Sequence, residues 1–279
     1  MTVQTEYDEG LGLFAGRIPL TMGTRMEFLC TEISRERAES VWQEIASRTD
    51  ELSRMLNRFD PESEVSRWNA GRSEGKMSRD LQAILEAGEQ MRERTGGLFD
   101  VCYGWHGRRA GGNNPGSRGT FEGLFHRKLD FGGIAKGWAL REAGELLEKE
   151  GIENAWLDFG GSSILARGRH PGGDCWKVSL PNPWAGDPRS RSAWTGDTLD
   201  VFSLRDSSLS TSGNRPAYSG HIVNPLTGAA EDSPKLVSVI SPDPLEAEVL
   251  STAAMVADEA QLAGLRTTFP NARINLYLP

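Results

Sequence analysis

Cysteine is scarce in this sequence. The three cysteines, Cys30, Cys102 and Cys175, lie far apart in a chain of 279 residues, and none has the paired spacing of a zinc or redox motif. An odd number of isolated cysteines favours reduced thiols over a disulfide framework. We therefore expect a reducing compartment.

Long hydrophobic runs are also missing. The chain has no run of about 18 consecutive apolar residues, so no transmembrane helix is predicted. Its first residues, MTVQTEYDEGLGLF, are acidic and lack the positively charged and apolar regions of a secretory signal. These features together predict a cytoplasmic protein.

Positive charge is in deficit. The chain has 31 Lys and Arg against 39 Asp and Glu, a net charge of -8. A nucleic-acid surface would need clustered positive charge, so nucleic acid is not an expected partner. An anionic ligand would have to be held by local features such as helix ends, turns or a metal ion.

The remaining composition is that of a globular protein, with 38% hydrophobic and 25% charged residues. The length of 279 residues suits one large domain or two small ones. No repeat and no long polar linker divides the chain. The sequence therefore predicts a single α+β domain over residues 1–279, with a mixed or antiparallel sheet flanked by helices.

Periodicity and capping signals place the main elements. Ser78 is expected to cap one helix, and Asp243 and Glu246 have the form of a capping box around Pro244. The expected elements are a hairpin over 18–33 around Gly23, helices over 35–58, 79–94, 134–150 and 244–258, a strand ending at Phe159, short strands and turns over 209–228, a strand over 236–240, and a final short helix and strand. Loops are expected at 59–70, 104–120 and 181–198.

The segment LDFGGIAKG, residues 129–137, combines an aspartate, a glycine pair and a lysine at the predicted start of a helix. Glycines there allow close backbone approach to a ligand, and helix N-terminal amides bind anions. The alternative is strand-to-helix packing with a solvated Lys136. The spacing matches neither a Walker loop nor GxGxxG, so the phosphate signal is weak by itself.

Glu248 and Thr252 stand four residues apart on the predicted helix over 244–258. They therefore lie on one face, where their oxygens would suit Mg²⁺ rather than zinc. A structural interpretation is stronger from this pair alone, because a threonine inside a helix usually bonds its own backbone and an early glutamate complements the helix dipole.

His221 is one of only four histidines and begins the segment HIVNP. A lone histidine in such a place is more often a structural hydrogen-bonding group than a catalyst. The preceding STSGN, residues 210–214, offers hydroxyls and a turn that could bind phosphate or nothing. No serine lies in GxSxG, which argues against a serine hydrolase.

Taken in order, eight blocks resemble the ApbE-type FAD:protein FMN transferase family, and the resemblance covers about residues 20–258. The blocks are MGT (22–24), PESEVSRWN (61–69), TGGLFD (95–100), LDFGGIAKGWAL (129–140), LDFGGS (157–162), STSGN (210–214), HIVNPLTG (221–228) and EAEVLSTA (246–253). The resemblance implies an ApbE-like α+β enzyme that binds FAD and Mg²⁺. It implies that the FMN part of FAD is attached to a Thr hydroxyl of an acceptor protein, with release of AMP.

Two other functions stay open. Some relatives pass the same FMN phosphoryl group to water, so the chain could be an FAD pyrophosphatase. It could also be an FAD-binding protein that has lost catalysis, because Glu248 stands where the family usually has Asp. A scaffold protein without flavin is the least supported class.

The resemblance also implies a set of site residues. Glu248, Thr252 and the main-chain carbonyl of Gly133 correspond to metal ligands, and His221 is the candidate for proton handling beside the diphosphate. Phe59 falls near a position that is often Tyr. The residues that correspond to FAD contacts are Met22, Phe59, Leu98, Phe99, Asp100, Asp130, Lys136, His221 and Ile222.

Overall fold

A large antiparallel sheet organises the molecule in the computed structural model, which describes residues 2–72, 76–102, 128–185, 197–214 and 219–279. Its eight strands run in the order β1-β2-β3-β4-β5-β8-β11-β12, and every neighbouring pair is antiparallel. The strands are β1 Gln4–Asp8, β2 Leu13–Thr21, β3 Thr24–Thr31, β4 Ala155–Phe159, β5 Ser163–Arg167, β8 Ser207–Gly213, β11 Leu236–Ser241 and β12 Arg273–Tyr277. The predicted α+β class with a sheet flanked by helices is confirmed.

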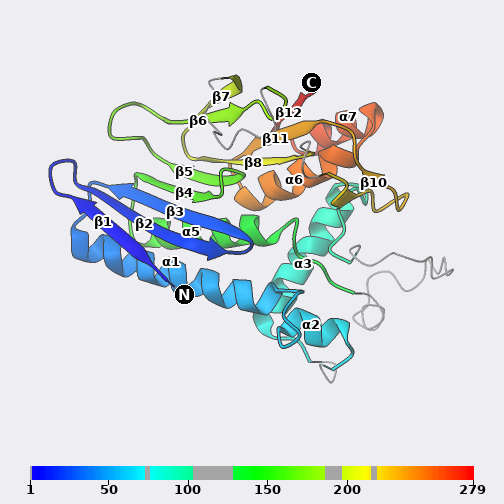
Figure 1. Ribbon diagram of the computed structural model, residues 1–279, viewed down its shortest axis with the longest axis horizontal. Helices are drawn as coiled ribbons and strands as arrows, with labels where there is room; N and C mark the ends of the chain where they lie inside the picture. Colours follow the sequence, from blue (N-terminus) through cyan, green and yellow to red (C-terminus); the bar gives the residue numbers. More distant parts are fainter. Residues whose placement is uncertain (1, 73–75, 103–127, 186–196, 215–218) are drawn as a thin grey trace.

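The two faces of this sheet carry different elements (Figure 1). Helices α1, α5 and α6 pack on one face, and the hairpin β6–β7 packs on the other. The helices are α1 Arg35–Leu56, α2 Glu64–Asn69, α3 Arg79–Arg94, α5 Ala135–Lys149, α6 Pro244–Val256 and α7 Glu259–Thr268; the remaining strands are β6 Trp176–Pro181, β7 Thr198–Leu204, β9 Ile222–Val223 and β10 Ala230–Glu231.

Aromatic packing fixes α1 on the sheet. The Trp42 indole stacks on Phe28 at a centroid distance of 5.5 Å. It also lies against Gly16, where an added Cβ would come within 2.5 Å of the ring. Because Gly16 and Phe28 face each other across β2 and β3, only a residue without a side chain at 16 leaves room for the indole.

Side chains cap four helices, including the predicted cap at Ser78. Ser34, Ser63, Ser78 and Asp258 each accept a hydrogen bond from the backbone of the first turn that follows. At α6 the Asp243 carboxylate accepts from the Leu245 amide. The predicted capping box is not seen there, because Glu246 pairs instead with Arg94 at 2.8 Å.

One of the predicted loops was wrong. The expected loop over 59–70 contains α2, because Ser63 caps it and Val65 and Trp68 bury their side chains in the core. The residues before α5 do not form a strand of the sheet, because the Asn69 side chain bonds both backbone groups of Leu129.

The four predicted helices begin and end within two residues of their predicted bounds. The hairpin turns at Gly23 as expected, but its first strand, β2, begins at Leu13 and not at residue 18. Strands β1, β5, β6, β7 and β10 were not predicted. The expected loop at 104–120 lies outside the described residues, as does most of the one at 181–198. Among the described helices, none combines the length and the apolar character needed to cross a bilayer.

Candidate functional site

The segment before α5 is held by side chains rather than by strand pairing. The Asn69 amide donates to the Leu129 carbonyl at 2.9 Å, and its oxygen accepts from the Leu129 amide at 2.6 Å. The Asp130 amide donates to the Val101 carbonyl at 2.7 Å, and the Asp130 carboxylate accepts from the Gly132 amide at 3.0 Å. These bonds join the 129–133 turn to both α2 and the segment after TGGLFD.

Helix α5 begins without a side-chain cap. The residue at its N-cap is Ile134, and within the described chain no side chain accepts from the first-turn amides. The first turn has no acidic residue and carries Lys136. The Ala135 amide donates to the Phe131 carbonyl at 2.9 Å, so the Lys136 and Gly137 amides and the positive end of the helix dipole are the features that suit an anionic ligand here.

Residues from distant motifs meet at this helix start. A Cβ added to Gly133 would lie 3.1 Å from the Phe99 ring and 3.4 Å from the Thr252 hydroxyl. Gly97 is likewise close to Leu226, with a corresponding distance of 3.1 Å. The tertiary structure therefore brings the motifs at 95–100, 129–140, 221–228 and 246–253 together.

Three of the predicted flavin-contact residues have their side chains in the core beneath this meeting point. Leu98, Phe99 and Ile222 are between 4% and 8% exposed, and all belong to one hydrophobic cluster. Met22 packs partly buried against that cluster from the β2–β3 turn. The Leu98, Phe99 and Ile222 side chains are therefore part of the hydrophobic core and not of the exposed surface.

Glu248 is turned inward. Its side chain is only 4% exposed, and one carboxylate oxygen, Oε2, accepts from the hydroxyls of Ser163 at 2.6 Å and Ser210 at 2.9 Å. The other oxygen, Oε1, pairs with the ammonium of Lys136. Sequence reasoning did not identify these partners, although the hydroxyls of STSGN had been noted.

Thr252 makes the hydrogen bond to its own helix backbone that is usual for a threonine inside a helix. Its hydroxyl donates to the Glu248 carbonyl one turn earlier at 3.3 Å. The same oxygen lies 3.5 Å from Ser212, whose hydroxyl is 2.8 Å from that of Ser251. A chain of hydroxyls thus links the Thr252 position to the Glu248 carboxylate through Ser210.

The donors present at this point fit a hard divalent cation in their chemistry. A carboxylate, a hydroxyl and a main-chain carbonyl are the oxygen ligands that Mg²⁺ uses. Thr252 and Gly133 are neighbours, and Glu248 already holds one cation, the Lys136 ammonium. A metal ion on Glu248 would require that ammonium to move.

Asp130 has a partner that the sequence motifs did not identify. Arg58 forms an ion pair with its carboxylate. The same guanidinium lies 4.8 Å from the centre of the Phe59 ring, a cation–π distance, and Phe59 is 82% exposed. Phe59 therefore offers an exposed aromatic surface beside the Arg58–Asp130 ion pair.

His221 lies directly before Ile222, whose side chain is in the hydrophobic core. Although the histidine side chain is exposed, neighbouring groups remove part of its solvent, and this desolvation lowers the pKa of His221 below its ordinary value of 6.5. The imidazole is therefore neutral at pH 7 and can accept a proton.

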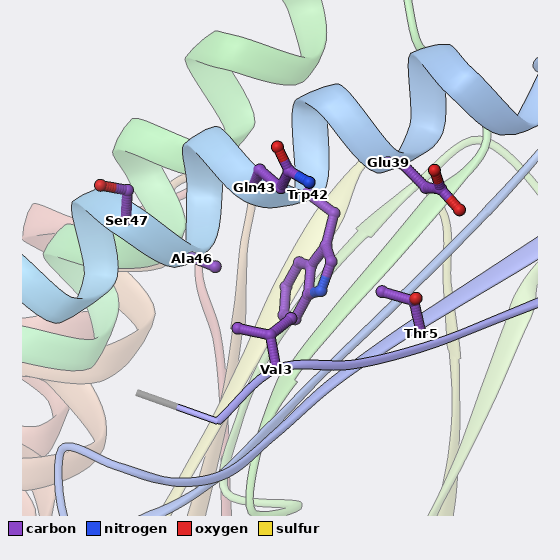
Figure 2. Close-up of a pocket in the computed structure, with 7 residues that line it drawn as sticks. All are labelled: Val3, Thr5, Glu39, Trp42, Gln43, Ala46 and Ser47. Carbon is purple, nitrogen blue, oxygen red and sulfur yellow. The ribbon is translucent and has the colours of Figure 1, made fainter.

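One groove lies apart from these residues. This groove of about 500 Å³ lies between the N-terminal strand and α1, where the Trp42 indole reaches toward Val3 and Thr5 (Figure 2). It is lined by none of the predicted site residues. The second LDFGG segment closes the β4–β5 hairpin, where Asp158 accepts from the Gly161 amide.

Within the described chain, one group of potential metal ligands includes a predicted residue. Atoms of Glu89, Asp100 and Cys102 lie within 4.8 Å of one another. Glu89 pairs with Arg92 at 2.9 Å, and Asp100 accepts from the Cys102 amide at 2.8 Å. A thiol prefers softer metals than Mg²⁺, so this donor set differs from the one around Gly133.

The chain was compared with known proteins. The sequence model of the ApbE family matches residues 22–120 and 122–273. The chain is similar to the FAD:protein FMN transferase of Treponema pallidum, with 25% identity over 94% of this chain and 86% of that protein. It is also similar to the FAD:protein FMN transferase of Vibrio cholerae, with 24% identity over 80% and 75% of the two chains.

Solved structures share the fold. The flavin transferase ApbE from Vibrio cholerae superposes with a TM-score of 0.70 at 20% identity, covering 98% of this chain and 93% of the other. The ApbE protein from Thermotoga maritima superposes with a TM-score of 0.69 at 21% identity, with the same coverage of 98% and 93%.

Proposed function

The chain belongs to the ApbE family and is a flavin transferase, and on this premise we propose that it attaches the FMN part of FAD to a threonine hydroxyl of another protein and releases AMP. In this reaction the acceptor oxygen forms a bond to the FMN phosphorus. The bond from that phosphorus to the bridging oxygen breaks, and the oxygen leaves with AMP. The proton of the acceptor hydroxyl passes to a base.

The meeting of Phe99, Gly133 and Thr252 at the uncapped start of α5 carries this proposal. Phosphoryl transfer depends mainly on positioning and on neutralising charge. The Lys136 and Gly137 amides in the first turn of α5 supply donors for the diphosphate, and Gly133 adds no side chain to the space between Phe99 and Thr252. Leu98 and Asp100 flank Phe99 in the sequence, and Leu98 and Ile222 belong to the same hydrophobic cluster as Phe99.

Glu248, Thr252 and the Gly133 carbonyl are the residues that would hold Mg²⁺. The bound ion would supply positive charge to the diphosphate and to the leaving AMP. The protein's own contribution is to fix the three donors: Ser163 and Ser210 hold the carboxylate of Glu248, while the backbone of α6 orients the Thr252 hydroxyl.

The flavin end of FAD is assigned to the rim near Met22, Phe59 and Asp130. The exposed Phe59 ring supplies stacking area, and the Arg58 guanidinium orients the Asp130 carboxylate. Lys136 is assigned to the phosphates rather than to the flavin because it lies in the first turn of α5.

His221 is assigned to proton handling. Its neutral state at pH 7 follows from the lowered pKa and is the state that accepts the acceptor's proton. Activity should fall as pH decreases through this pKa, because protonation removes the base. Replacing His221 with Ala should lower AMP release at least a hundredfold, by the usual worth of general-base catalysis.

His170→Ala provides a matched control for that variant. His170 is exposed and packs its ring against Trp176, away from the assigned residues. Its replacement should leave AMP release unchanged. Full activity in His221→Ala would remove this histidine from the mechanism.

The central experiment incubates the purified protein with FAD and MgCl₂, with and without EDTA, and measures AMP. AMP together with fluorescent flavin that remains bound to a partner protein on a denaturing gel supports the transferase. AMP and FMN without any acceptor would instead identify an FAD pyrophosphatase. FAD binding without AMP would identify a non-catalytic flavin-binding protein, the function favoured by the inward Glu248.

A single domain over residues 1–279 and a cytoplasmic location complete the proposal. Limited proteolysis that yields one protease-resistant core tests the first. Cell fractionation tests the second.

A further inference from the structure

Glu248 already has a cation at the place where the proposed function needs a metal. From this arrangement we infer that Lys136 competes with the divalent cation for Glu248, so that metal binding releases the lysine from an internal ion pair. This inference rests on the proposed function and adds a residue that sets metal affinity.

The two carboxylate oxygens of Glu248 have different tasks. Oε2 is held from the sheet side by the hydroxyls of Ser163 on β5 and Ser210 on β8. Oε1 contacts the Lys136 ammonium from α5. Since Oε2 is already satisfied by two donors, Oε1 is the oxygen available to a cation.

The close packing of α5 on α6 allows this pairing. A Cβ on Gly137 would lie 2.6 Å from the Glu248 Cβ and 2.8 Å from the Pro244 carbonyl. The absence of a side chain at 137 therefore lets the two helices come together at Glu248. The neighbouring Lys136 can then reach the carboxylate.

The site has room for one cation at Oε1. Mg²⁺ binds oxygen at about 2.0–2.1 Å, so a metal on Oε1 would place its charge close to the ammonium in a desolvated environment. Repulsion between like charges there is strong because little water screens it. The Lys136 side chain is flexible and 20% exposed, so its ammonium can leave Glu248 and move toward solvent.

The identity of residue 248 adds to this competition. A glutamate extends one methylene further than the aspartate usual in the family, and its carboxylate reaches the serines of the sheet and the lysine together. In this chain the metal-free state is therefore a satisfied buried ion pair rather than an uncompensated carboxylate.

The first test measures Mn²⁺ binding to the FAD-free protein from the electron paramagnetic resonance signal of free Mn²⁺. Lys136→Met should bind Mn²⁺ at least tenfold more tightly than the unmodified protein. Lys149→Met, which changes an exposed lysine on the same helix, should bind as the unmodified protein does. Equal or weaker binding by Lys136→Met would overturn the inference.

The second test needs no variant, which matters if Lys136→Met fails to fold. Lysine acetylation of the unmodified protein is followed by mass spectrometry with and without saturating MgCl₂. Labelling of Lys136 should rise several-fold with Mg²⁺, while labelling of Lys149 stays constant. Unchanged Lys136 labelling would show that the ion pair does not open.

These measurements are independent of turnover. AMP release with no change in Lys136 labelling would leave the proposed function standing and overturn the competition. A metal-dependent rise in labelling without AMP release would support the competition and count against catalysis.

Discussion

The pentapeptide LDFGG occurs twice, at residues 129–133 and 157–161, and folds differently in the two places. In both copies the leucine and the phenylalanine are at most 2% exposed. The first copy forms a turn that leads into α5 at the candidate site. The second is the end of β4 and the turn into β5.

The two copies differ in the backbone conformation of their glycines and in the partners of their aspartates. Gly160 and Gly161 have φ of 64° and 75°, in the left-handed region, whereas Gly132 and Gly133 do not. Asp158 is buried and accepts from Gly161, while Asp130 pairs with Arg58. The same residues therefore close a hairpin in one place and form the turn into α5 in the other.

The largest difference in stability is expected between alanine substitutions at the first glycine of each pair, Gly160 and Gly132. Gly160→Ala places a Cβ 2.1 Å from the Thr24 hydroxyl at a positive φ, and should lower the free energy of unfolding by about 2–4 kcal/mol. Gly132→Ala should cost less than about 1 kcal/mol, because its φ suits alanine. Urea denaturation measures both, and equal losses would show that the two turns are constrained alike.

Alanine at the second glycine of each pair should lower activity in the first copy, at Gly133, and stability in the second copy, at Gly161. Gly133→Ala crowds Phe99 and Thr252 and should lower kcat/KM for FAD about tenfold, roughly 1.4 kcal/mol of transition-state stabilisation. Gly161→Ala should lower stability by about 1–2 kcal/mol because of its positive φ, with kcat/KM unchanged. Loss of activity in Gly161→Ala alone would reverse the assignment of the two segments.

The smallest effects concern the aspartates. Burial raises the pKa of Asp158, so the fold disfavours its charged form, and wild-type stability decreases as pH rises through the folded pKa. Asp158→Asn keeps an oxygen for Gly161 and should be slightly more stable than wild type at pH 7, by less than Gly161→Ala costs. The difference should vanish below pH 3.8, the ordinary pKa of Asp.

Asp130→Asn tests the corresponding aspartate in the first LDFGG copy. Its ion pair with Arg58 is partly exposed, so the stability change should be below about 1 kcal/mol. The KM for FAD should rise several-fold if this carboxylate orients the flavin. An unchanged KM would leave Asp130 with a purely structural role.

Local sequence signals predicted the hairpin and most helices because their causes are local. A serine or aspartate before a periodic apolar stretch is sufficient to start α1, α3 and α7. The short helix α2 was missed because its six residues are too few to show a period. Its burial against the core stabilises it.

The candidate site was only partly predictable for a related reason. The motifs containing Gly133, Glu248 and Thr252 are visible in the sequence, and the fold brings Gly133 and Thr252 together. The direction of the Glu248 side chain depends on Ser163, Ser210 and Lys136, which come from three other elements. No local pattern encodes such a set of partners.

The sequence alone determined the family, the class of fold and which residues can cap, turn or bury, because these follow from side-chain chemistry and short-range spacing. Only the tertiary structure decided which conformation each LDFGG copy adopts and which cation Glu248 holds. Those outcomes depend on contacts between segments more than 70 residues apart, such as Arg58 with Asp130 and Lys136 with Glu248. Their energies exist only once the chain has packed.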